Sequence, residues 1–129
     1  GVHEMTYSLF VHNGGFSAEN VVNPAYELNI PAVAVKGKAK NEQSFLTIDA
    51  DNVICEVVKP VESGENGYGL RLYECEGTRA KANVALSRAG KEIYEANMLE
   101  DLKAKLEAKD SVLSLDFKPF EIKTIVVLE

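Results

Sequence analysis

The feature that most constrains the fold is a succession of short runs rich in β-branched and apolar residues, separated by turn-forming residues. The clearest run is the last one, residues 120–128 (FEIKTIVVL), which follows another such run, residues 112–117, across Lys118-Pro119. Proline cannot donate to a strand ladder, so it marks a break between two strands. Seven or eight such runs at regular spacing predict two packed sheets, because one sheet of this size would leave an apolar face in water. The predicted fold class is an all-β antiparallel β-sandwich with one or two short helical segments.

The remaining strands are predicted from period-2 alternation and β-branched content. They comprise residues 3–12, 45–50, 53–58, 70–75, 80–87 and 91–96. A short apolar run at residues 32–35 and a polar connector precede residue 45, and residues 60–67 are predicted to form a surface loop. We expect residues 80–87 to form a hairpin with residues 70–75, with Ala82, Val84 and Leu86 facing inward.

Two segments have helical features. Ser17 could cap a helix that runs to Leu28, but Pro24 lies deep inside that segment, so a helix and an extended chain both remain open. Further on, Leu99, Leu102 and Leu106 share one helical face, with charges of both signs between them through residue 109. This spacing predicts a short amphipathic helix.

Composition limits the class of protein. The 129 residues are 46% apolar and 26% charged, which is typical of one globular domain, so we predict a single domain over residues 1–129. The net charge of -6 and the scattered lysines argue against nucleic acid as a partner. No apolar run is long enough to cross a membrane and no signal peptide is visible, so we expect no membrane partner and a cytoplasmic location. The chain begins with Gly1 instead of Met, so we expect a domain of a longer protein.

The residues that could bind a metal are few. His3 and His12 are the two histidines; in an extended strand they would lie roughly 30 Å apart on opposite faces, and we interpret them as turn and edge residues. Cys55 and Cys75 occur in separate predicted strands and are expected to be free, buried thiols.

Among the many carboxylates, Glu74 and Glu95 are the best candidates for a special role, since a carboxylate among apolar neighbours needs a partner. Arg71 or Arg79 could supply it. A structural ion pair is favoured over a catalytic pair, because charged strand residues ordinarily face water or protect an edge.

Sugar-binding sites commonly use exposed aromatic rings beside amides and carboxylates. The chain has no tryptophan, and its tyrosines lie mostly at alternating strand positions, where packing is the simpler interpretation. They are Tyr7, Tyr26, Tyr68, Tyr73 and Tyr94.

Five segments, in order along the chain, together resemble one known family. They are residues 3–12 (HEMTYSLFVH), 25–29 (AYELN), 69–74 (GLRLYE), 95–100 (EANMLE) and 119–124 (PFEIKT). The sequence resembles the C-terminal β-sandwich region of family 38 glycoside hydrolases, the α-mannosidases, over essentially its whole length.

The resemblance implies a noncatalytic C-terminal domain of a larger α-mannosidase. In that family the zinc and the aspartate nucleophile belong to an N-terminal domain, so we assign no catalytic, cofactor-binding or metal residue to this chain, and we expect zinc in the missing catalytic domain. The implied partners are the catalytic and middle domains of the same parent chain, with carbohydrate as a further candidate. The loop at residues 13–20 and the segment at residues 26–29 are candidate interface regions.

Two other functions compete with this one. The same sandwich could be a free-standing carbohydrate-binding or protein-interaction module. Alternatively, the isolated chain could itself be a hydrolase, which predicts turnover of an aryl α-mannoside with added zinc. We expect no such turnover.

Overall fold

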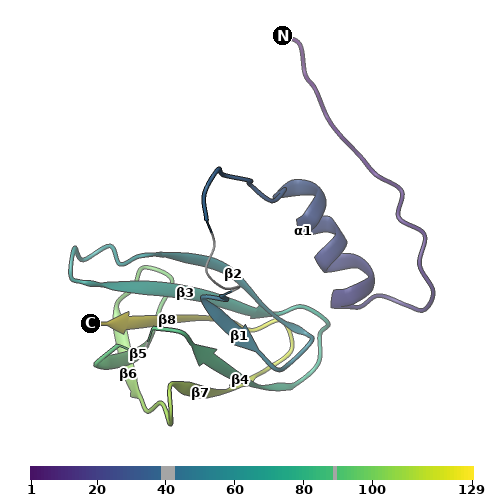
Figure 1. Cartoon of the computed structure of the whole chain (residues 1–129). Helices are drawn as coiled ribbons and strands as arrows, with labels where there is room; N and C mark the ends of the chain where they lie inside the picture. Colours follow the sequence, from purple (N-terminus) through teal and green to yellow (C-terminus); the bar gives the residue numbers. More distant parts are fainter. Residues whose placement is uncertain (39–42, 89) are drawn as a thin grey trace. The chain divides into compact units, whose positions relative to one another are not determined.

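The computed structural model describes residues 1–38, 43–88 and 90–129 (Figure 1). They fall into two compact units, one from Gly1 to Lys38 and one from Ala39 to Glu129. The polar connector predicted before residue 45 lies partly outside the described residues. The single domain over residues 1–129 stays a prediction, and the two units are described separately.

Within its described residues, the second unit is built from eight strands in two antiparallel sheets. The strands are β1 (Leu46–Ile48), β2 (Val53–Pro60), β3 (Gly67–Glu74), β4 (Ala80–Leu86), β5 (Glu92–Ala96), β6 (Leu102–Leu106), β7 (Val112–Phe117) and β8 (Ile122–Leu128). One sheet has the order β1-β4-β7 and the other β2-β3-β8-β5-β6. The predicted all-β antiparallel sandwich is confirmed.

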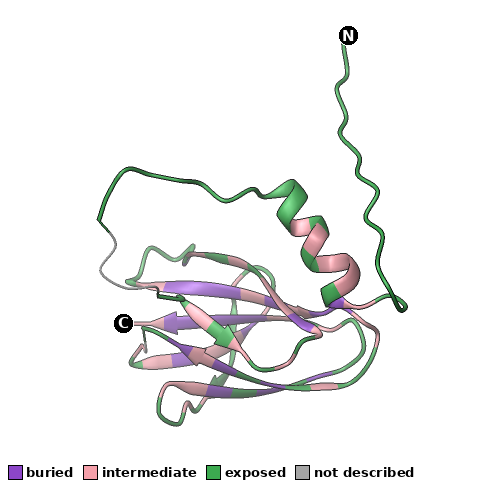
Figure 2. Ribbon diagram, turned by 45° about the vertical axis from the view of Figure 1, so that its right-hand side comes forward, coloured by how far each residue is buried: buried purple, intermediate pink, exposed green. Residues whose placement is uncertain are grey.

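The core lies between the inner faces of the two sheets. Buried positions, purple in Figure 2, lie along strands of both sheets, and in β4 and β7 they alternate with more exposed ones. The five-stranded sheet contributes Leu70, Leu72 and Ile125, and the three-stranded sheet contributes Val84 and Leu113. Because these side chains are almost completely removed from water, their burial is the main force that holds the sheets together.

The C-terminal run forms a central strand. β8 pairs with β3 on one side and with β5 on the other, and Thr124 to Val127 are buried in succession. A strand covered on both faces carries a continuous apolar run instead of alternation. Ile125 and Val127 enter the core between the sheets, while Val126 packs with Val61 and Ala96 in a second cluster, so the run IVVL reflects apolar packing on both faces.

The predicted hairpin between residues 70–75 and 80–87 is wrong, although Ala82, Val84 and Leu86 do face inward. β3 pairs with β2 and β8, whereas β4 pairs with β1 and β7. The residues between β3 and β4 therefore connect the two sheets. The physical reason is that β2 and β8 occupy both edges of β3, and the carboxylate of Glu74 binds the connection as described below.

The predicted helix around Leu99, Leu102 and Leu106 is also wrong. Residues Leu102–Leu106 form strand β6, which pairs with β5 at the edge of the five-stranded sheet. Three leucines with helical spacing are weak evidence for a helix. Here the backbone hydrogen bonds to β5 stabilise a strand instead. Lys103 and Lys105 then occupy exposed positions on an edge strand.

The predicted strand at residues 3–12 does not form. These residues have no regular secondary structure, and all of them are exposed. Their alternating pattern is that of a strand, but a strand requires a partner for its backbone groups. The sequence pattern alone therefore did not determine the structure of this segment.

The undecided segment after Ser17 is helical. A π-helical turn, η1 (Ala18–Val22), precedes helix α1 (Asn23–Asn29), and the Ser17 hydroxyl accepts a hydrogen bond from the Asn20 N–H at 3.1 Å. Pro24 is tolerated because α1 begins at Asn23, which places the proline in the first turn. The helices of the described residues are too short and too polar to span a membrane.

Candidate functional site

The buried carboxylate of Glu74 connects three turns of the sandwich by hydrogen bonds. Glu74, at the end of β3, is completely buried, and each of its two oxygens accepts hydrogen bonds from protein groups. Backbone N–H groups of Glu76, Gly77 and Phe120 donate at 2.8–2.9 Å, and the Asn52 amide donates at 2.9 Å. One side chain thus joins three turns: the turn before β2, the β3–β4 connection and the turn before β8.

These bonds fix the charge of Glu74. Burial alone would raise the pKa of the carboxyl group, but the backbone N–H groups, led by that of Phe120, outweigh burial and lower the pKa from 4.5 to about 2. A carboxylate saturated by such donors remains ionised at neutral pH and is not available as a general acid. Its role is to hold the two sheets in register at this end of the sandwich.

The predicted arginine partners are wrong for both glutamates. Glu74 is bound by backbone and amide groups, while Glu95 pairs with Lys123 at 3.2 Å. Arg71 instead donates to the Met98 carbonyl oxygen at 3.1 Å. The sequence identified both carboxylates but did not identify their partners. Two donors to Glu74 are the backbone N–H groups of the turn that follows it, and the other partners, Asn52, Phe120 and Lys123, are distant in the chain.

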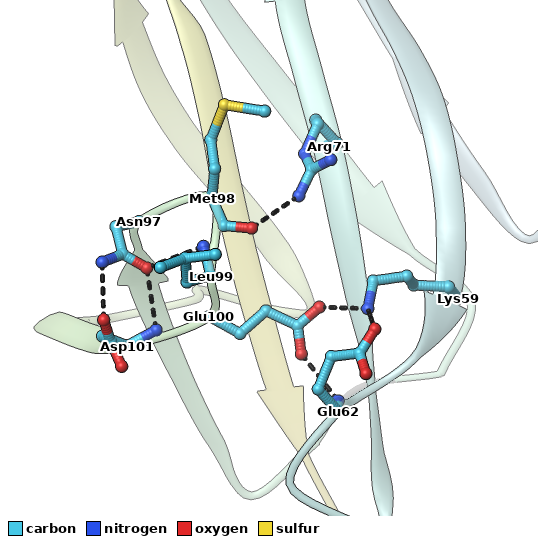
Figure 3. A network of polar contacts seen from close by, with 8 residues as sticks. All are labelled: Lys59, Glu62, Arg71, Asn97, Met98, Leu99, Glu100 and Asp101. Atoms are coloured by element: carbon cyan, nitrogen blue, oxygen red, sulfur yellow. Dashed lines mark hydrogen bonds and ion pairs between the residues drawn. The ribbon is translucent and has the colours of Figure 1, made fainter.

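A second polar network fixes the turn between β5 and β6 (Figure 3). The Asn97 side-chain oxygen accepts hydrogen bonds from the N–H groups of Leu99 and Asp101, both at 2.9 Å. Its amide nitrogen donates to the Asp101 carboxylate at 2.7 Å. The turn at residues 97–101 is therefore closed by its own first residue, a common role of asparagine.

Glu100 connects this turn to β2. Its backbone has a φ of 66°, which is unusual for a residue other than glycine, and its carboxylate lies 2.5 Å from Lys59 Nζ and 2.7 Å from the Glu62 N–H. The Lys59 contact is an ion pair with poor hydrogen-bond geometry at Oε1. Burial of Glu100 opposes the charge, but the Glu62 N–H and Lys59 outweigh it and hold the pKa below its usual value.

This contact requires the turn to fold back over the outer face of the five-stranded sheet. β5 and β2 are separated in that sheet by β8 and β3, yet Glu100 reaches Lys59 on β2. A Cβ atom at Gly69 on β3 would lie 3.4 Å from Glu100 Oε1, so a larger side chain there would press on the carboxylate. The turn thus covers the centre of a face that would otherwise be open to water.

Exposed apolar side chains gather around this fixed turn. Met98 and Leu99 are 57% and 81% exposed, and Figure 3 shows both on the turn next to the network. The strand register places Leu102 and Ile122 on the same outer face, and both are also exposed. We call these four residues the outer apolar patch. A rigid apolar projection of this kind is typical of a protein–protein contact.

A hollow at another part of the sandwich has mixed chemistry. It has a volume of about 750 Å³ and is lined by Gln43, Ser44, Phe45, Ser87 and Arg88. Phe45 is 39% exposed and meets the Tyr68 ring edge-on, with ring centres 5.0 Å apart. An exposed ring beside amide, hydroxyl and guanidinium groups has the chemistry that a sugar requires.

The other candidate residues are not brought together. His3 and His12 are both exposed, and Cys55 and Cys75 are free, as predicted, with Cys75 buried and Cys55 half-buried. Tyr68 is buried and donates to the Arg88 carbonyl oxygen, whereas Tyr7 is exposed and Tyr94 is half-buried. In the described part of the chain, no group of three or more His, Cys, Asp or Glu residues is placed to hold a metal.

Sequence reasoning missed three residues that shape these sites: Lys59, Glu100 and Phe45. The expected helix at residues 99–109 concealed the turn. Asn97, immediately after the apolar strand residues 93–96, is a turn-forming residue that could have indicated a hairpin. The interface predictions at residues 13–20 and 26–29 stay predictions.

Comparison with known proteins finds one matching family model and two similar mannosidases. Residues 52–125 match the family model described as "Glycosyl hydrolases family 38 C-terminal beta sandwich domain". The chain is 31% identical to human "Alpha-mannosidase 2C1" and 30% identical to the mouse protein of the same name, in each case over 99% of this chain. It spans 13% of the length of each of these relatives.

Proposed function

Because the chain belongs to glycoside hydrolase family 38, as its C-terminal β-sandwich domain, we propose that it is a noncatalytic supporting domain of a larger α-mannosidase. The catalytic and middle domains of the same parent chain are its partners in this proposal. Zinc in the catalytic domain and a cytoplasmic location are part of the proposal as well. No residue of this chain is assigned a catalytic or metal-binding role.

The outer apolar patch carries the proposal. Met98 and Leu99 are exposed, but the network of Asn97, Glu100 and Lys59 gives the turn a fixed shape. Ordering a contact surface in advance lowers the entropy cost of docking. A catalytic domain that buries this patch would gain apolar contact area without first having to order the turn.

The test replaces apolar residues of the patch by acidic ones in the parent protein. Replacing Met98→Asp and Leu99→Asp together should lower the melting temperature of the parent and its hydrolysis of an aryl α-mannoside. The same pair should leave the stability of the 129-residue chain within about 0.5 kcal/mol, because exposed side chains contribute little to folding.

Ser114→Asp is the matched control, since Ser114 is exposed on β7 of the other sheet. It should leave the parent unchanged. If the patch variant and the control behave alike in the parent, the outer apolar patch does not contact the catalytic part.

A contribution to carbohydrate binding is a second candidate, and the hollow beside Phe45 favours it. Titration with mannose oligosaccharides should shift NMR resonances of residues that line the hollow, and Phe45→Ala should abolish the shifts. Absence of any shift at millimolar sugar would exclude even weak binding and remove this candidate.

A further inference from the structure

The N-terminal segment has the pattern of a strand but the environment of an exposed chain. Met5, Tyr7, Leu9 and Val11 alternate with other residues, and all four are at least 84% exposed. An exposed stripe of apolar side chains is a candidate for a surface that is covered in the assembled protein. We name the stripe of these four side chains the odd face.

The opposite face of the segment lies beside the helical residues of the same unit. Ser8, Phe10 and His12 line a hollow of about 260 Å³ together with residues of η1 and α1. The corner between the segment and the helix is fixed, because the Asn20 amide donates to the carbonyl oxygens of Asn13 and Gly15 at 3.1 and 3.2 Å. Ser8, Phe10 and His12 thus face the helix, and the odd face remains bare.

The edges of the sandwich are protected against an added strand. β6 carries exposed Lys103 and Lys105, β2 has a register shift and ends at Pro60, β7 carries exposed Asp116, and β1 has only three residues. Charges, prolines and bulges at an edge disfavour pairing with another strand. The sandwich is therefore a poor acceptor for this segment.

The relatives extend well beyond the region that this chain covers. The family model begins at residue 52, but similarity to the two mannosidases covers 99% of the chain, including the N-terminal segment. The N-terminal segment is thus shared with these proteins while lying outside the matched sandwich.

We infer that residues 3–12 become a β-strand by addition to the open edge of a β-sheet in the part of the parent protein outside this chain. The odd face would enter the core of that part, and α1 would cover the other face. Backbone hydrogen bonds supply affinity in such strand addition, and alternate side chains supply specificity. The inference rests on the proposed function in taking the parent to be a longer protein of this family.

Hydrogen exchange of the full-length parent tests the inference. Amides of residues 3–12 should exchange at least about tenfold more slowly in the parent than in the 129-residue chain, because strand pairing protects them. Equal exchange in the two proteins would overturn the inference. Protection in the 129-residue chain that grows with its concentration would also overturn it, since a second copy would then be the partner.

Two variants of the parent separate strand addition from a general effect. Leu9→Asp changes the odd face and should remove the protection of residues 3–12, whereas Thr6→Asp, at an even-numbered position, should preserve it. Equal effects of both variants would overturn the proposed orientation. If Leu9→Asp prevents folding of the parent, the wild-type comparison still decides.

The outcome is independent of the enzymatic proposal. Exchange is measured without a substrate, so a protected segment in a parent that does not hydrolyse α-mannosides would refute the proposed function alone. An active parent with an unprotected segment would refute the strand addition alone.

Discussion

Residues 3–12 and strand β3 carry the same kind of alternating pattern and have opposite fates. In β3, Leu70 and Leu72 are almost completely buried between two sheets, and hydrogen-bonded strands lie on both sides. In the N-terminal segment, Tyr7 and Leu9 are both 90% exposed and no strand forms. Period-2 alternation thus identifies a segment that can have one buried face. Whether that face is buried depends on a partner that the local sequence does not contain.

Core truncation should separate the two regions most strongly. Leu72→Ala should lower the free energy of unfolding of the 129-residue chain by about 3–4 kcal/mol, because it removes a fully buried side chain and leaves a cavity. Leu9→Ala should change it by less than about 0.5 kcal/mol. Urea denaturation measures both values. A large cost for Leu9→Ala would mean that the N-terminal segment packs in the isolated chain after all.

Neutralising the buried carboxylate should have the next largest effect. Glu74→Gln should lower the free energy of unfolding by about 2–3 kcal/mol, because the side-chain amide would present a donor group to backbone N–H donors. The exposed Glu56→Gln on β2 is the matched control and should stay within about 0.5 kcal/mol. Similar costs for both variants would show that the three turns do not depend on Glu74.

Acid should affect the sandwich through the same carboxylate. The pKa of Glu74 is lowered in the folded chain to about 2 from 4.5, so its contribution is complete above pH 4.5 and is lost as the pH falls from 4.5 toward 2. Denaturation curves between these pH values should therefore be less pH-dependent for Glu74→Gln than for the wild-type chain. In the 129-residue chain we expect the amide hydrogens of residues 3–12 to exchange without structural protection at any pH in this range, because these residues form no strand. Acid-sensitive protection of these amides would contradict the difference between the two regions.

The smallest expected difference in the free energy of unfolding is between substitutions of two asparagines, one in each compact unit. Asn97→Ala should cost about 1 kcal/mol, because the Asn97 side chain closes the β5–β6 turn with three hydrogen bonds. Asn29→Ala in α1 should cost less than about 0.5 kcal/mol, since that side chain makes one exposed bond to the Ala25 carbonyl oxygen. Denaturation of the two variants checks the order. A larger cost for Asn29→Ala than for Asn97→Ala would contradict the stronger contribution expected from the three hydrogen bonds of Asn97.

The sequence predicted the elements of the sandwich better than their connections. β4 was recognisable because its apolar residues alternate with the period of a strand, and β8 because its apolar residues form a continuous β-branched run. The pairing of β3 with β8 was not, since it joins residues far apart in the chain. Adjacent β3 and β4 suggested a hairpin, but β2 and β8 occupy both edges of β3, and Glu74 binds the connection to the other sheet.

The candidate site was predictable in part. Glu74 and Glu95 were identified because buried carboxylates require partners, but the partners are Phe120, Asn52 and Lys123 instead of arginines. Glu100 was hidden by a helical interpretation of three leucines. Its φ of 66° and its ion pair with Lys59 depend on how the turn folds over the sheet, which no local pattern encodes.

Enzymatic assay of three proteins tests the central claim most directly. Hydrolysis of an aryl α-mannoside with added zinc is measured for the full-length parent, for a parent that lacks this 129-residue region, and for the 129-residue chain. The account predicts turnover by the full-length parent, loss of most of it in the shortened parent, and none from the 129-residue chain. Turnover by the 129-residue chain, or full activity of the shortened parent, would contradict a noncatalytic supporting domain.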